Sequence, residues 1–95
     1  MRLQFSGAVF EWRGPAPHHF VALSPEVADA VASVSARASY GWGCIPVLAT
    51  VGDTSWRTSL IPKDGGYLLP LRVSVRAAEG IAPGQTVAAE LVIDP

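Results

Sequence analysis

Residues 67–87, YLLPLRVSVRAAEGIAPGQTV, decide the fold that the sequence predicts. The first four read as a short strand, and Pro83-Gly84 predicts a turn before a final strand. Apolar residues alternate from 69 to 75, which favours a strand through the middle of this stretch. Gly80, however, is a favourable residue just beyond the end of a helix. The pattern alone therefore leaves strand and helix open between the two flanking strands.

An earlier segment repeats this plan. Residues 21–27, VALSPEV, match residues 67–73, YLLPLRV, in having a short strand, a corner marked by proline and the start of a small helix. In the earlier copy Ser24 can cap the helix, and Pro25 suits its first position. The repeat predicts two pseudo-symmetric strand-helix-strand halves joined into one small barrel. We expect residues 1–95 to form a single domain of this kind.

The remaining segments read mainly as strands. Residues 3–12 are apolar, but the alternation changes parity across Gly7, which predicts a β-bulge there. Residues 44–51 and 54–61 flank Gly52-Asp53, which predicts a two-residue hairpin turn. Further expected features are a short strand at 18–23, a second turn at 62–66 and a last strand at 87–93. The predicted fold class is mainly β, with two short helices.

Composition narrows the classes of function. Of the 95 residues, 49% are hydrophobic, and the net charge is −1 with no cluster of basic side chains, which argues against nucleic-acid binding. Cys44 is the only cysteine, which excludes an intrachain disulfide and a thiolate zinc cluster and suits a cytoplasmic protein. The sequence shows no membrane span and no signal peptide. We expect neither a cofactor nor a metal ion.

Aromatic and basic residues beside turns suggest a binding cleft. Trp12, Trp42, Trp56 and Tyr67 would form its apolar wall, because rings give a large contact area at small entropic cost. Arg57 and Arg76 would be the polar anchors for a small molecule or peptide. The same tryptophans can instead fill the barrel, and the arginines can form ordinary surface ion pairs.

A second hypothesis is an enzyme that uses acid–base chemistry on a metabolite. His18 or His19 would act with Glu11 or Cys44 as acid and base. Adjacent residues on a strand point to opposite faces, so both histidines cannot serve one site. Cys44 is otherwise a small core residue.

Four motifs together resemble the DUF1905 family of small bacterial domains, over about residues 5–91. They are WRGPAP at 12–17, GWG at 41–43, WRTSL at 56–60 and YLLP at 67–70. The resemblance implies a double-split β-barrel and no established activity. Two positions depart from the family pattern as we expect it: Cys44 replaces a serine, and His18 replaces an aromatic residue.

Residues 75–87 also resemble swapped-hairpin proteins of the AbrB and MazE type, in which a short helix precedes a Pro-Gly turn and a strand. This resemblance favours a helix over residues 72–79. It also implies a third hypothesis, a DNA-binding regulator or antitoxin with a basic face on a dimer, against which the even charge distribution argues. The sequence leaves a monomer and a homodimer open.

Overall fold

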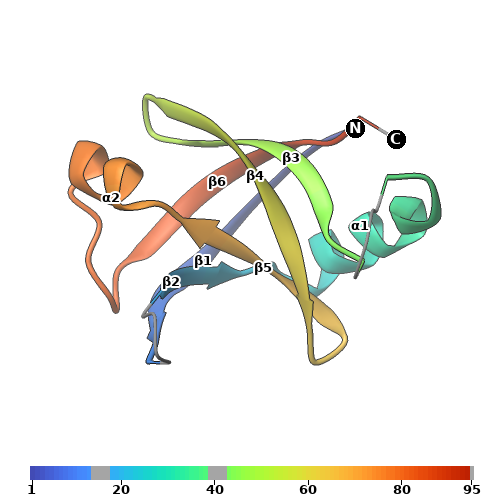
Figure 1. The fold of residues 1–95 in the computed structure, drawn as a ribbon, viewed down its shortest axis with the longest axis horizontal. Coiled ribbons are helices and arrows are strands. Elements are labelled where there is room, and N and C mark those ends of the chain that lie inside the picture. Colours follow the sequence, from blue (N-terminus) through green and yellow to red (C-terminus); the bar gives the residue numbers. More distant parts are fainter. Residues whose placement is uncertain (14–17, 39–42, 95) are drawn as a thin grey trace.

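The fold is a closed, six-stranded antiparallel barrel with two short helices, as the sequence predicted (Figure 1). The computed structural model describes residues 1–13, 18–38 and 43–94. Around the barrel the strands follow the order β1-β2-β5-β4-β3-β6. The elements are β1 (Arg2–Trp12), β2 (His18–Ala22), α1 (Pro25–Ala38), β3 (Ile45–Val51), β4 (Thr54–Lys63), β5 (Gly66–Leu71), α2 (Val73–Glu79) and β6 (Thr86–Val92).

Two equivalent halves build this barrel. Exchanging β1 with β4, β2 with β5 and β3 with β6 leaves the order of strand neighbours unchanged. Each half is a β-hairpin followed by a helix and a third strand, so the predicted strand-helix-strand unit gains one strand at its start. The predicted pseudo-symmetry is confirmed at the level of strand pairing.

The interior of the barrel is apolar and is covered by the helices. Ile45, Leu60 and Leu91 are fully buried inside it. The two helices lie on opposite sides of the barrel in Figure 1, and each presents buried valines, among them Val31 from α1 and Val75 from α2. Residues 73–79 are helical, as the resemblance to the swapped-hairpin proteins implied. Burying apolar side chains of this size contributes about 1.5–3 kcal/mol each.

The alternation of β1 runs without the predicted bulge. Its register continues from Arg2–Ala8 against β6 into Val9–Trp12 against β2. Phe5 and Val9, on either side of Gly7, are both buried in the interior. A Cβ atom on Gly7 would lie 2.8 Å from Val21 Cγ1 and 3.0 Å from the Ala22 carbonyl oxygen. The bulge prediction is therefore wrong, since the glycine is explained by the close approach of β2.

The turn between β4 and β5 is tighter than predicted. It contains only Asp64 and Gly65, with φ angles of 52° and 80°, and Lys63 pairs with Gly66 across it. Two successive positive φ angles are typical of a type I′ hairpin turn, which suits the twist of the flanking strands. Pro62 and Lys63, expected in the turn, are thus the last two residues of β4.

Candidate functional site

An apolar groove of about 260 Å³ lies on the outer wall of the barrel, between the ends of the two hairpins. These hairpins, β1–β2 and β4–β5, extend to the same side of the molecule in Figure 1. We call this feature the outer groove. It is lined by Phe10, Trp12, Phe20, Ile61, Pro62, Lys63 and Leu68.

Strand alternation places the groove residues on the outside of the wall. Val9 and Val21 pair across β1 and β2 and point into the interior, so the next pair, Phe10 and Phe20, points outward. The two phenylalanine rings are 5.9 Å apart between centroids. Phe20 is buried without being part of the interior core, which shows that a second apolar cluster exists outside the barrel.

The other hairpin supplies the opposite side. Ile61 of β4 pairs with Leu68 of β5, and both line the outer groove. Lys63 lies two residues beyond Ile61 and therefore on the same face of β4. No ion pair found among the described residues involves Lys63.

The apolar side chains of the outer groove are unusually exposed. The exposed fraction is 59% for Trp12, 38% for Phe10 and 37% for Ile61. The described chain has two further large exposed apolar side chains, Met1 and Val73, and neither lines this groove. Single exposed apolar residues need no explanation, whereas three that converge on one concavity mark a candidate binding site.

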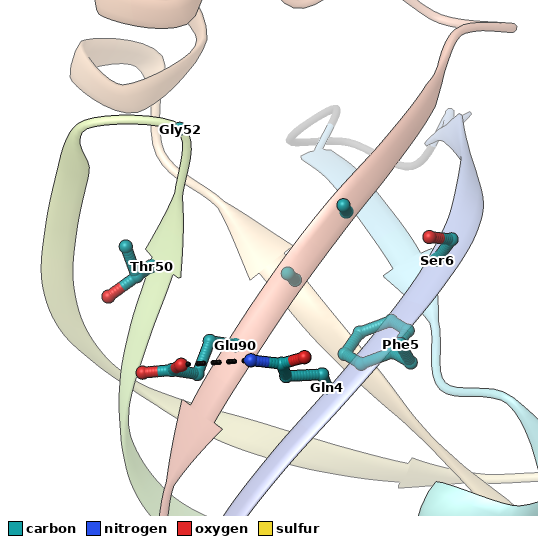
Figure 2. A pocket seen from close by; sticks show the side chains of 8 residues that line it. Gln4, Phe5, Ser6, Thr50, Gly52 and Glu90 are labelled. Atoms are coloured by element: carbon teal, nitrogen blue, oxygen red, sulfur yellow. Dashed lines mark hydrogen bonds between the residues drawn. The ribbon is translucent and has the colours of Figure 1, made fainter.

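A second concavity lies over β1, β6 and β3 (Figure 2). It is larger, about 520 Å³, and its charged group is Glu90. Gln4 donates a hydrogen bond of 3.3 Å to Glu90, and Arg2 lies 3.7 Å from the same carboxylate. Because Glu90 already has a hydrogen bond from Gln4 and an ion pair with Arg2, this surface offers a ligand less than the outer groove does.

Of the described residues predicted for one aromatic and arginine cleft, only Trp12 lines the outer groove. Trp56 points into the interior and is buried, so it lies on the other side of the wall from Trp12. Tyr67 lines a neighbouring concavity of about 320 Å³ that shares Pro62 and Lys63 with the groove.

The predicted arginine anchors lie elsewhere as well. Arg57 lines a small concavity of about 140 Å³ beside β3 and β6, and its backbone carbonyl accepts a hydrogen bond from Arg72. Arg76 is half-buried on α2, and its Nε atom is buried without a hydrogen-bond partner among the described residues. Trp42 lies outside the described residues. The described members of the predicted cleft therefore do not converge on one site.

The two histidines point in opposite directions, as strand geometry required. His18 is exposed, with its ring centroid 6.0 Å from that of Phe20. His19 is buried, and its Nε2 atom lies 3.8 Å from Glu11 Oε2, which is too long for a hydrogen bond. Arg13 Nε lies 3.2 Å from the other oxygen of Glu11. Cys44 is a free, half-buried cysteine.

One signal in the sequence corresponds to the outer groove, although it predicts a bulge. The change of apolar parity along residues 3–12 does not record a bulge. Instead, Phe10 and Trp12 belong to a second apolar face. Ile61 and Lys63 were not recognised as neighbours on one face of a strand, because the sequence predicted that the strand ends at residue 61 and that Lys63 lies in a turn. The groove residues missed from the sequence are Phe10, Phe20, Ile61, Pro62, Lys63 and Leu68.

Two further observations concern metal binding and membrane-spanning helices in the described residues. Within residues 1–13, 18–38 and 43–94, no group of three or more His, Cys, Asp or Glu side chains is placed to hold a metal ion. None of the helices described here has the length and apolar character needed to cross a membrane.

Comparison with known proteins agrees with the resemblance seen in the motifs. No curated protein matches the chain. The family model of a domain of unknown function, DUF1905, matches residues 5–91, which include all six strands in whole or in part and both helices. The chain therefore belongs to the DUF1905 family.

Proposed function

We propose that this chain is a binding domain whose outer groove takes an apolar group of a small molecule or peptide. The supporting observation is the convergence of Phe10, Trp12 and Ile61, all partly exposed, on one concavity. Keeping such side chains in water is unfavourable by about 25 cal/mol for each Å² of apolar surface. A ligand that covers them recovers this free energy, and the buried Phe20 below gives the groove a firm base.

The other two hypotheses have less support. An acid–base enzyme needs its acid and base in a cleft within reach of a substrate. The closest candidate pair, His19 and Glu11, is 3.8 Å apart and does not line the outer groove. A DNA-binding regulator needs a concentrated basic face, and the even distribution of seven basic and eight acidic residues along the sequence argues against one.

Titration with the neutral fluorophore N-phenyl-1-naphthylamine tests the proposal. We expect saturable binding, and Trp12→Ala should raise the Kd about 10-fold, because an aromatic contact is worth roughly 1.4 kcal/mol. Val73→Ser is the matched control, since Val73 is 72% exposed but lies on α2, outside the groove. Fluorescence enhancement gives the Kd, and amide NMR spectra check that each variant is folded.

The proposal also specifies where the ligand signals should appear. Binding should shift the amide resonances of Phe20 and Leu68, which lie under the groove. Absence of saturable binding to the wild-type protein, or equal affinity in Trp12→Ala and Val73→Ser, would refute the outer groove as the binding site.

A further inference from the structure

The outer groove is built from equivalent positions of the two pseudo-symmetric halves. Aligning the last residues of β1 and β4, and the first residues of β2 and β5, superimposes three groove residues of one hairpin on three of the other. The seventh lining residue, Pro62, falls on Glu11, which does not line the groove. The alignment also maps the strand pair Phe10–Phe20 onto the pair Ile61–Leu68. The corresponding residues are Phe10 with Ile61, Phe20 with Leu68, and Trp12 with Lys63.

The two halves carry chemically different side chains at only one of these three corresponding positions. Two join apolar residues to apolar residues, whereas the third joins an exposed indole, Trp12, to an ammonium group, Lys63. The floor of the groove is thus apolar in both halves. Its two equivalent rim positions differ, with an aromatic ring at one and a positive charge at the other. A ligand that uses both rim positions must itself have two unlike ends.

From this asymmetry we infer that the outer groove binds a small organic acid, with its aromatic or aliphatic body against Trp12 and its carboxylate at Lys63. This assignment rests on the function proposed above and names the class of ligand. Lys63 is free of ion pairs among the described side chains, so its charge is available to an anion. Charge complementarity at this rim therefore favours an anion over a cation or a neutral ligand.

The size of the groove favours a small molecule over a long peptide. Its volume of about 260 Å³ lies just below the usual ~300–1,000 Å³ of ligand sites. One or two rings with a short acidic chain match this volume. The groove opens to water at its rim, so the carboxylate remains partly hydrated while the rings are covered.

A matched pair of probes, 2-naphthylacetate and 2-naphthylacetamide, tests the inference. They share the ring system and differ in charge. We expect the acid to bind about 2- to 5-fold more tightly than the amide, because a partly exposed ion pair contributes little more than that. Lys63→Gln should abolish this preference, whereas Arg57→Gln, an exposed cation outside the groove, should keep it. Raising the salt concentration from about 20 mM to about 500 mM should weaken binding of the acid and leave binding of the amide unchanged.

The pseudo-symmetry allows a stricter test. The double variant Trp12→Lys with Lys63→Trp exchanges the two rim positions, so it should retain the preference for the acid while the ring shifts move to the opposite hairpin in NMR spectra. If both probes bind with equal Kd values and Trp12→Ala abolishes the binding of both, the carboxylate assignment is wrong, whereas the proposed binding function still holds. If neither probe binds, or if Trp12→Ala instead removes a concentration-dependent dimer, the small acid is refuted as the occupant. In the dimer case a second copy of the chain occupies the groove.

Discussion

Replacement of Gly7 by alanine should destabilise the barrel, because β2 passes close to β1 at this residue. The new methyl group would lie 2.8 Å from Val21 Cγ1, about 0.7 Å inside the ~3.5 Å optimum for carbon atoms. Val21 is fully buried, and the second contact, at 3.0 Å, is the backbone oxygen of Ala22 in the paired strand β2. Neither neighbour can move without disturbing the core or the sheet.

The size of the effect follows from two opposing terms. Overpacking of a well-filled interior costs about 1–3 kcal/mol, and the stiffer unfolded chain of the alanine variant returns about 0.4–1 kcal/mol. We expect a net loss of about 1–2 kcal/mol, which corresponds to a fall in Tm of about 5–15 °C for a domain of this size. Urea unfolding followed by circular dichroism measures the loss.

Gly66→Ala is the matched control for this variant. Gly66 also lies in a strand without a positive φ, but the nearest atom to its added Cβ, the Lys63 carbonyl oxygen, is 3.8 Å away. This variant should be neutral or slightly more stable than the wild type. A Gly7→Ala protein whose free energy of unfolding equals that of the control would contradict the close approach of β2, and with it our explanation of this glycine.

Substitutions at two further sites test the contact with α2, at Gly52, and the interior, at Trp56. Gly52→Ala should lower the free energy of unfolding by about 1–3 kcal/mol, because Gly52 has a φ of 58° and its Cβ would collide with the Glu79 carboxylate. Glu79→Ala in the same chain should recover part of the loss in urea unfolding, and no recovery would exclude the collision. Trp56→Phe should change stability by only about 1 kcal/mol, because the buried indole Nε1 has no hydrogen-bond partner to lose within the described part of the chain. In thermal unfolding, a loss above roughly 3 kcal/mol would contradict this expectation.

The helix at residues 73–79 shows why local pattern and fold must be read together. The alternation of Val73 and Val75 suggested that both residues share one face of a strand. In the helix they point in different directions, so Val75 is buried and Val73 is among the most exposed apolar residues. Gly80 was the informative residue, since its φ of 63° ends the helix as expected for a glycine at this position.

The outer groove was harder to predict from the sequence than this helix. Its two sides come from hairpins far apart in the chain, and the long-range pairing of β2 with β5 brings them to one wall. Residue type alone also does not tell which side of a strand a ring occupies. Trp12 and Trp56 seemed alike in the sequence, but parity relative to Val9 and Leu60 sends the first outward and the second into the core.

The position of β6 has a consequence for how the chain folds as it is synthesised. This strand pairs with β1 on one side and with β3 on the other, although it is made last of the six. Until residue 92 has left the ribosome, β1 and β3 each present an open edge, and such edges invite pairing with other chains. Because these long-range pairings must await the final strand, we expect closure of the barrel to be a slow, late step that follows release of the last strand.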